Sequence, residues 1–443
     1  MNTIKCLSNL RSGSVLARNF STSNLNFANH KCRVLVVGGG CGGTAVAAKL
    51  AYRLGAGQVT VLESSDKHYY QPLFTLIGGG MKKLEDSYRP MKDTLSCLTT
   101  WVKDRAAKFN PTTNTVETEN GDTIEYDYLV VATGIEVNYE AIPGLVDALK
   151  VPKGPVCSIY SPLYVNRVYD AFQSFKGGNA IFTFPASPVK CPGAPQKILY
   201  IFEHYTRKNK KRNAAKLYYN TSLPVIFGVK HYADALWKVV EKRDINVNLR
   251  TNLVEVLPNG REAVFENLDT KERKIMDFNL LHVTPPMRPP LVLRENSGDL
   301  VNEAGFVEVN RYTMQHMKYK NIFALGDCTN SPNSKTAAAA AAQCQVVYKN
   351  LSAIMEGREV ERNYDGYASC PLVTGYNTCI LAEFDYNLQP LESFPFEQAK
   401  ERWSMFVMKK DLMPPLYWHL MMNGLWNGPS FILYIRRDGR RLM

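Results

Sequence analysis

The chain has 443 residues and a formal net charge of +12, with 45% hydrophobic and 21% charged residues. This composition is typical of a folded protein and excludes a disordered or collagen-like chain. The length favours two or three domains. The ten cysteines include no CxxC pair and no cluster with histidine at metal-ligand spacing, so the sequence predicts no metal site.

The N-terminal residues have a charge pattern of their own. No Asp or Glu occurs before Glu63, whereas Lys5, Arg11 and Arg18 lie in a stretch rich in Ser, Asn and Leu. A basic, acid-free and serine-containing start is typical of a mitochondrial transit peptide, and we assign residues 1–30 to one. A disordered basic tail is the alternative that these residues leave open.

Residues 33–63 have the order of elements that binds a dinucleotide. An apolar strand at 33–37 leads into a turn of sequence GGGCGG, an alanine-rich helix at 44–54 and a second strand at 58–63. The amides at the start of such a helix have no intrahelical partner and attract phosphates. This order of elements predicts a Rossmann-like unit that holds a dinucleotide.

The glycines of the turn follow the GxGxxG pattern. Gly38 permits the tight turn, Gly40 lets the backbone approach a pyrophosphate, and Gly43 lets the helix pack on the strand. Glu63 ends the second strand, where its carboxylate can accept hydrogen bonds from ribose hydroxyls. These four residues are predicted cofactor contacts.

Two later segments indicate which dinucleotide is bound. Residues 126–134, which end in Thr133 and Gly134, and residues 321–327, which end in Asp327, resemble segments of flavoproteins with two dinucleotide-binding domains. The resemblance, together with an acid at the end of the second strand, implies FAD in the first site. It also implies that the late acid binds the ribityl chain. Taken alone, that acid is equally well explained as a helix cap or turn residue.

Lys335 precedes a helix-forming run of alanines. We predict that its ammonium group and the helix N-terminus face the pyrimidine edge of the flavin, where positive charge favours the reduced form. A solvated lysine in the first turn is the alternative.

Residues 146–306 are predicted to form a second Rossmann-like domain. Its expected strands and helix lie at 179–184, 224–228, 246–250, 253–256 and 232–242. A nucleotide-binding version would carry a glycine-rich turn after the first strand. The loop at 185–197 instead has one glycine and a cysteine, Cys191. It is therefore expected to present a sulfur rather than to bind a pyrophosphate.

The setting of Cys191 favours a reactive thiol. Pro192 follows it and suits the first turn of a helix, so the thiol is expected near a helix N-terminus. That position, with Lys190 and Lys197 nearby in sequence, stabilises a thiolate and lowers the pKa. A thiolate of low pKa is a good nucleophile or leaving group. The remaining cysteines are by default small apolar core residues.

The C-terminal region has an uncharged aromatic segment. Residues 413–435 contain no Asp, Glu, Lys or Arg, and arginines follow them. The aromatic residues of the segment are Tyr417, Trp418, Trp426, Phe431 and Tyr434. Proline, glycine and asparagine interrupt it, which argues against a membrane-spanning helix and favours a segment lying in a membrane interface. A buried core or dimer segment is the alternative.

Five motifs together resemble the sulfide:quinone oxidoreductases of mitochondria. They are GGGCGG at 38–43, HYYQPLFTLIGGG at 68–80, PVKCPGAPQK at 188–197, SCPLVTG at 369–375 and FPFEQAKER at 394–402. The likeness runs from about residue 32 to about residue 430.

The resemblance implies a redox pair of Cys191 and Cys370 beside FAD, with Gln71 among the cofactor contacts. Sulfide would leave a persulfide on Cys370, and Cys191 would be released as the thiolate that passes electrons to the flavin. The outer sulfur would go to glutathione or sulfite, and two electrons to ubiquinone. The family also implies a peripheral position on the matrix side of the inner mitochondrial membrane and no nucleic-acid partner. Some bacterial relatives have a third redox cysteine, so a role for Cys157 stays open.

The sequence therefore predicts an α/β fold with two Rossmann-like domains, FAD/NAD(P)-binding and disulfide-reductase-like, and a C-terminal membrane-associating segment. The expected parts are a transit peptide (1–30), an FAD domain (31–145 and 307–350), a second domain (146–306) and a C-terminal region (351–443). The alternative function is an NADH:quinone dehydrogenase of the same fold, which the loop at 185–197 disfavours. A flavin-bearing binding protein without turnover is a third possibility.

Overall fold

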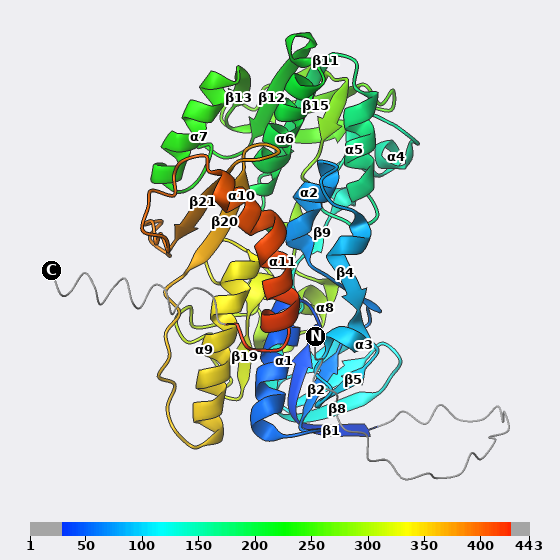
Figure 1. Ribbon diagram of the computed structural model, residues 1–443. Coiled ribbons are helices and arrows are strands. Elements are labelled where there is room, and N and C mark those ends of the chain that lie inside the picture. The colour runs from blue at the N-terminus through cyan, green and yellow to red at the C-terminus, as the bar shows by residue number, and fades with distance from the viewer. Residues whose placement is uncertain (1–28, 427–443) are drawn as a thin grey trace, which may run out of the picture.

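The computed structural model describes residues 29–426, and a seven-stranded sheet forms its lower half in Figure 1. The strand order is β5-β2-β1-β8-β7-β6, and β19 pairs with the end of β8. The strands are β1 (Asn29–Val37), β2 (Val59–Leu62), β5 (Thr99–Val102), β6 (Ala106–Asn110), β7 (Thr115–Thr118), β8 (Thr123–Val131) and β19 (Ile322–Ala324). Strands β6, β7 and β8 form an antiparallel meander, and the remaining pairings are parallel.

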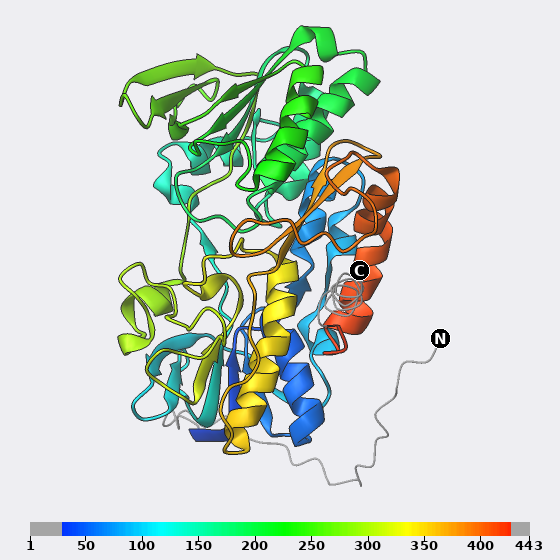
Figure 2. The same cartoon turned by 90° about the vertical axis from the view of Figure 1, so that its left-hand side faces the viewer.

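Two helices cover one side of this sheet. Helix α1 (Cys41–Leu54) and helix α9 (Ala337–Met355) lie side by side in both ribbon views (Figures 1 and 2). Both contribute buried alanines, whose small side chains let helices approach closely. The central parallel strand β2 is buried along its whole length and is apolar apart from Thr60, as expected for a strand covered on both faces.

The upper half of the molecule is built on a second, fully parallel sheet. Its strand order is β10-β17-β11-β12-β13. The strands are β10 (Val156–Cys157), β17 (Leu280–His282), β11 (Gly178–Phe184), β12 (Ala215–Thr221) and β13 (Ile245–Asn248). Helices α4 (Leu145–Lys150), α5 (Val165–Ser174), α6 (Ala194–Lys208) and α7 (Lys230–Lys242) accompany it, as does an antiparallel meander of β14 (Thr251–Val256), β15 (Glu262–Asn267) and β16 (Arg273–Asp277).

Smaller elements connect the two halves. The ribbon of β9 (Glu136–Val137) and β18 (Met287–Arg288) pairs the two chain segments that cross between them. The others are β3 (Lys67–Tyr69), α2 (Phe74–Gly78), β4 (Tyr88–Pro90), α3 (Met91–Thr94) and α8 (Leu291–Glu295).

The C-terminal part of the described chain lies between the two halves. A hairpin of β20 (Ala368–Val373) and β21 (Cys379–Phe384) is followed by a helical run that descends over the lower half in Figure 1. The run consists of α10 (Trp403–Val407), a π-helical turn (Met408–Leu412), α11 (Met413–Leu416) and a second π-helical turn (Tyr417–Met421). Within residues 29–426 no helix is both long and apolar enough to cross a membrane.

The predicted fold class is confirmed, with two local errors. The expected strand at 224–228 is a series of bends, and β12 takes its place in the sheet. Pro224 cannot donate to a ladder, and Val225 is exposed. The first strand begins at Asn29, inside the predicted transit peptide, and residues 1–28 of that prediction lie outside the described residues. The predicted Phe431 and Tyr434 also lie outside them.

Candidate active site

The glycine turn after β1 is as tight as its sequence predicts. Gly38 has a φ of +104°, and a Cβ built on it would lie 2.4 Å from the Ala132 carbonyl oxygen. A Cβ on Gly43 would lie 1.8 Å from the Gly38 carbonyl oxygen. The Glu63 carboxylate accepts a hydrogen bond from the Gly39 amide at 2.7 Å. The turn is therefore held against the ends of the neighbouring strands.

Three other glycines border open space at the strand ends. A Cβ built on Gly40, Gly134 or Gly326 would meet no atom within 4 Å. Gly40 precedes α1 and provides no side chain to cap it, so the first amides of the helix are free for an anion. The buried Thr133 hydroxyl makes no hydrogen bond within residues 29–426. A cradle of glycines and uncapped amides fits a dinucleotide pyrophosphate.

The remaining predicted cofactor contacts are Asp327, Lys335 and Gln71. Asp327 lies in the turn after β19, and within the described chain its carboxylate accepts no hydrogen bond from protein. Burial raises the pKa of this carboxyl, and Lys335 opposes the rise. The Lys335 ammonium is half-buried and donates to the Thr329 carbonyl at 3.0 Å. Gln71 is exposed at the start of a 3₁₀ turn before α2.

The structure brings Cys191 and Cys370 together. Cys191 lies just before α6, Cys370 lies in β20, and each thiol shifts the pKa of the other. A Cβ on Gly193 would lie 2.6 Å from both Cys370 Sγ and Leu372 Cδ2. The lone glycine of the loop therefore allows β20 to approach the start of α6.

Two lysines place positive charge on this thiol pair. Lys197 Nζ donates to Cys191 Sγ at 3.3 Å. The neighbouring Cys370 thiol lowers the pKa of Cys191 well below its ordinary value, with help from Lys197 and Lys409, although burial opposes it. The neighbouring Cys191 raises the pKa of Cys370. These opposite shifts favour a thiolate on Cys191 over one on Cys370.

Lys409 is the member of this group that sequence reasoning missed. Its ammonium donates to the Pro72 carbonyl at 2.7 Å, and burial lowers its pKa to about 8. The available signal was a lysine directly after the apolar residues Met405, Phe406 and Met408, which a helix buries on one side.

The backbone at Cys191 is strained and held by neighbours. Its φ is 53°, in the left-handed region that non-glycine residues rarely adopt. The Cys191 amide donates to the Lys335 carbonyl at 2.7 Å, and the Tyr160 hydroxyl donates to the Cys191 carbonyl at 3.4 Å. Such strain persists only where surrounding contacts determine the geometry, and it clusters at functional sites. The bond to Lys335 also ties the cysteine loop to the lower half of the molecule.

Arg243 connects the segments that carry the two cysteines. Its guanidinium bonds Glu203 on α6, the Thr374 carbonyl just after β20, and Glu401. Both Arg243 and Glu203 are buried or nearly so. These contacts of Arg243 were not predicted, because no sequence signal links the positions.

Cys157 is not part of the thiol group. It lies in β10 with no exposed surface, and burial alone raises its pKa. This is the behaviour of a core thiol rather than of a third redox cysteine.

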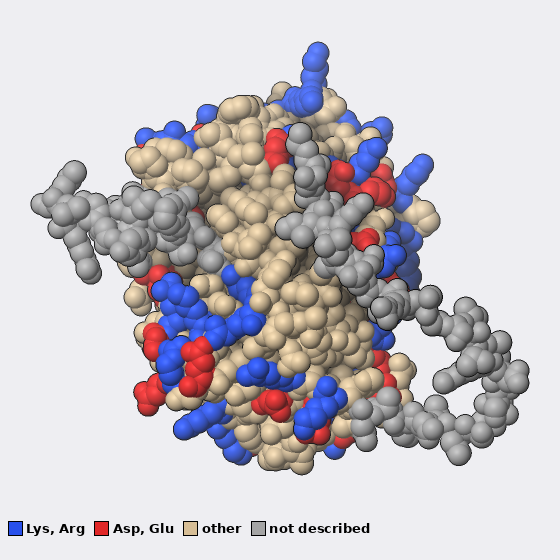
Figure 3. Space-filling model, turned by 60° about the horizontal axis from the view of Figure 1, so that its bottom comes forward, with Lys and Arg blue, Asp and Glu red and all other residues tan. Residues whose placement is uncertain are grey.

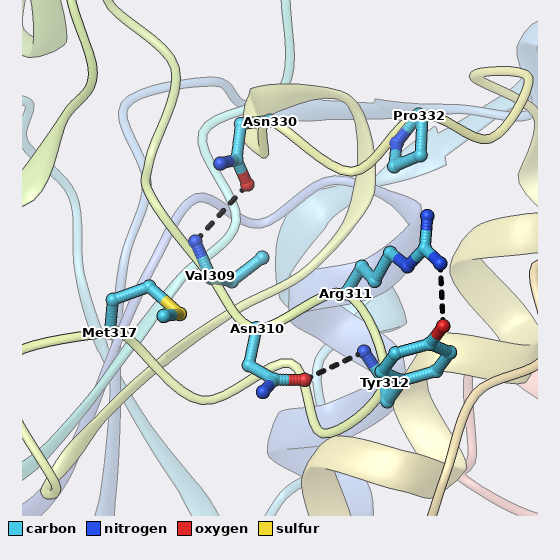
Figure 4. Close-up of a pocket in the computed structure, with 7 residues that line it drawn as sticks. All are labelled: Val309, Asn310, Arg311, Tyr312, Met317, Asn330 and Pro332. Carbon is cyan, nitrogen blue, oxygen red and sulfur yellow. Dashed lines mark hydrogen bonds between the residues drawn. The ribbon is translucent and has the colours of Figure 1, made fainter.

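A surface hollow of about 290 Å³ lies away from the cysteines. It is lined by Val309, Asn310, Arg311, Tyr312, Met317, Asn330 and Pro332 (Figure 4). Its polar groups bond one another: the Asn330 carbonyl oxygen accepts from the Val309 amide, and Arg311 donates to the Tyr312 hydroxyl. None of the predicted site residues lines it.

Comparisons with known proteins agree with this architecture. The pyridine nucleotide-disulphide oxidoreductase family matches residues 32–157 and 225–343, and it leaves out the segment that carries Cys191. A curated mouse protein, the mitochondrial sulfide:quinone oxidoreductase, is 49% identical over 91% of this chain and 89% of its own length. The protein of the same name from Dictyostelium discoideum is 42% identical over 90% of this chain and 87% of its own.

The crystal structure of the Aquifex aeolicus sulfide:quinone oxidoreductase superposes with a TM-score of 0.73. The superposition covers 89% of this chain and 92% of the Aquifex aeolicus chain, and the two sequences are 21% identical. At that identity the likeness concerns the fold alone.

Proposed function

The chain belongs to the family of mitochondrial sulfide:quinone oxidoreductases, and we propose that it oxidises hydrogen sulfide, passing two electrons through FAD to ubiquinone and sulfane sulfur to glutathione or sulfite. The observation that carries the proposal is the packing of Cys370 against the Cys191 loop at Gly193, beside the Lys197 ammonium that bonds Cys191. A thiolate and a thiol in contact are the reduced form of an exchangeable disulfide.

The cycle starts from the oxidised pair, in which Cys191 and Cys370 share an S–S bond. Hydrosulfide attacks Cys370 Sγ, a new S–S bond forms there, and the old bond breaks with its electron pair on Cys191. Lys197 at 3.3 Å stabilises the charge of this leaving thiolate. A leaving thiol of low pKa departs faster, which supports Cys191 as the leaving group.

The acceptor then takes the outer sulfur of the Cys370 persulfide. Attack by a glutathione thiolate or by sulfite on the outer sulfur breaks the sulfur–sulfur bond, and the proton of that outer sulfur passes to Cys370 Sγ, which leaves Cys370 as a thiol beside the Cys191 thiolate. Closing the disulfide again releases two electrons and one proton. Lys197 and Lys409 add positive charge that attracts the anionic sulfide and acceptor.

Bound FAD supplies the two-electron acceptor for the pair and the donor for quinone. We infer that the free amides after Gly40 hold its pyrophosphate and that the Glu63 carboxylate binds a ribose hydroxyl. We assign the ribityl chain to Asp327, whose carboxylate lacks a protein donor. Further contacts are assigned to Thr133, Gly134 and Gln71. Lys335 and the start of α9 add positive charge on the flavin side.

Contacts at α6 speak against NADH as the electron donor. A pyridine nucleotide would place its pyrophosphate at the start of the helix after β11. Cys370 and Leu372 pack against Gly193 at that point. The helix start therefore serves the cysteine pair, and the NADH:quinone dehydrogenase remains the less favoured function.

We further propose a peripheral position on the matrix side of the inner mitochondrial membrane. The support is a row of exposed apolar residues along the C-terminal run, between 40% and 67% exposed: Trp403, Leu412, Leu420 and Leu425. Figure 3 shows charged side chains gathered toward the edges of one face and an uncharged middle. Tyr417 and Trp418, predicted to lie in the interface, are buried instead and anchor the run to the protein.

The two sheets support the proposed division into domains. Strands of the first sheet come from residues 29–131 and 322–324, and strands of the second from residues 156–282. We keep the FAD domain at 31–145 and 307–350, the second domain at 146–306 and the C-terminal region at 351–443.

Stopped-flow absorbance distinguishes the two redox functions. Sulfide added to the oxidised holoprotein is expected to bleach the flavin rapidly, and NADH at the same concentration is not. Rapid bleaching by NADH alone would overturn the proposal.

Cysteine variants test the pair itself. Cys191→Ser and Cys370→Ser are each expected to abolish sulfide-dependent quinone reduction while the flavin stays bound, as measured by absorbance. The matched control is Cys157→Ala, a core thiol outside the pair, which should keep turnover. Normal turnover in either pair variant would contradict the mechanism.

A further inference from the structure

The C-terminal helical run contacts the glycine turn through two buried side chains. His68 Nδ1 lies 2.9 Å from the Gly39 carbonyl oxygen, and His68 Nε2 lies 2.5 Å from the Tyr417 hydroxyl. Cys41, the first residue of α1, lies near enough to Tyr417 for each group to shift the pKa of the other. The two hydrogen bonds of the His68 ring thus connect Tyr417 to the glycine turn.

The chemistry of the groups fixes the direction of each hydrogen bond. Burial lowers the pKa of His68 to about 4, so the ring is neutral at pH 7 and carries one N–H. The Gly39 carbonyl can only accept, so that hydrogen is on Nδ1. Nε2 must then accept from the Tyr417 hydroxyl.

Both backbone polar groups of Gly39, its amide and its carbonyl, are held by hydrogen bonds. Its amide donates to Glu63, and its carbonyl accepts from the Thr44 hydroxyl at 2.8 Å as well as from His68. Because the peptide unit is planar and trans, a fixed Gly39 carbonyl also fixes the Gly40 amide, which points the opposite way. No protein acceptor takes that amide within residues 29–426.

Other contacts hold the helical run on the same segment. The Tyr417 ring lies 4.3 Å from the Tyr70 ring, and Arg89 lies over the Trp418 ring at 4.6 Å. Figure 1 shows the run lying over the lower half, where it reaches α1.

We propose that Tyr417 and His68 are positioning residues that orient the glycine turn for the flavin pyrophosphate, so that docking of the C-terminal run controls how firmly the cofactor is held. The inference rests on the proposed FAD site. It adds that the run with the exposed apolar row also holds the cofactor loop in place.

Hydrogen exchange of the holoprotein tests the inference directly. Tyr417→Phe removes the donor to His68 and keeps the ring. Amides in a peptide covering residues 38–44 are expected to exchange about fivefold faster, as for the loss of one hydrogen bond. The matched control is Tyr70→Phe, whose hydroxyl makes no hydrogen bond within the described chain and whose loss should leave exchange unchanged. Unchanged exchange at 38–44 in Tyr417→Phe would overturn the proposal.

A second pair of variants separates positioning from mere folding. His68→Asn keeps a donor near Nδ1 for Gly39 and should restore most of the loop protection, whereas His68→Leu should not. Adding Tyr417→Phe to His68→Leu should not increase amide exchange further, because the two residues act through the same series of hydrogen bonds. Additive effects, or equal exchange in the Asn and Leu variants, would contradict the inference.

Flavin release provides the functional readout. Fluorescence of free flavin after dilution should rise about fivefold faster in Tyr417→Phe than in the parent. Faster flavin release with unchanged amide exchange at residues 38–44 would contradict the positioning role. The exchange result does not depend on which substrate reduces the flavin, so a failure of the sulfide proposal remains distinguishable.

Discussion

Cys191 combines strain, charge and sulfur chemistry in one residue. A left-handed φ brings its thiol to Cys370 and Lys197, and backbone bonds to Lys335 and Ala194 hold it there. The sequence predicted a lowered pKa from a helix N-terminus, with Lys190 and Lys197 nearby. The contacts that lower it are those of Cys370, Lys197 and Lys409.

Removing the nearest cation should weaken the thiolate. In Lys197→Met the pKa of Cys191 is expected to rise by about one unit, so the pH at which alkylation of the reduced enzyme reaches half its maximal rate should rise by about one unit. The rate is measured by mass spectrometry of the Cys191 peptide. Lys208→Met, at the exposed far end of α6, is the control. The same half-maximal pH in the two variants would count against the role of Lys197.

A buried histidine predicts acid sensitivity. Burial lowers the pKa of His282 to about 3, whereas an unfolded histidine titrates near 6.5. Below about pH 6.5 the unfolded chain therefore binds a proton that the folded chain does not, so stability falls as the pH falls. The slope is about 1.4 kcal/mol per pH unit, or about 2 kcal/mol between pH 7 and pH 5.

Thermal unfolding at pH 7 and pH 5 measures that loss. His282→Gln should lose less stability on acidification than the parent, and the exposed His419→Gln should lose as much as the parent. The same acid loss in all three proteins would show that His282 is not responsible.

The element that decides the site is the contact between α6 and β20. It depends on one glycine, because Gly193 leaves room for Cys370 and Leu372. The sequence of neither element indicates that the two elements pack together.

Gly193→Ala should push β20 away from α6. The added methyl group is expected to cost about 1–3 kcal/mol and to reduce sulfide-dependent quinone reduction at least tenfold. Gly228→Ala is the matched control, since a Cβ there meets no atom within 4 Å. Thermal unfolding and turnover are measured together, and parental turnover in Gly193→Ala would refute the packing argument.

The whole molecule has one mixed and one parallel sheet, and a C-terminal run with two faces packs on it. The inner face buries Tyr417 and Trp418, and the outer face exposes leucines. The segment is thus a core element and a candidate membrane contact at once, which were alternatives for the sequence.

Membrane contact is tested on the outer face only. The triple variant Leu412→Gln, Leu420→Gln and Leu425→Gln should sediment with cardiolipin-containing vesicles at least tenfold less than the parent, because burying each leucine contributes about 1.5–3 kcal/mol. Ile275→Gln, an exposed apolar residue on β16, is the control. Unchanged sedimentation of the triple variant would place the membrane contact elsewhere.

The sequence by itself determined the features that depend on neighbours along the chain. The strand, turn and helix around Gly38, Gly40 and Gly43 follow from local backbone sterics and apolar periodicity, and so does the second sheet. Local pattern failed at 224–228, where an apolar run cannot join a ladder after Pro224 and forms bends instead.

Only the tertiary structure decided which distant groups meet. The partnership of Cys191 and Cys370 came from resemblance, and Lys409, Arg243 and the contact of His68 with Tyr417 could not be read from spacing at all. Such contacts depend on how whole elements pack, and the residues at each end look the same in sequence whether or not they touch. Burial of Tyr417 has the same origin, because an aromatic residue on an amphipathic segment suits a membrane or a protein core equally well until its neighbours are known.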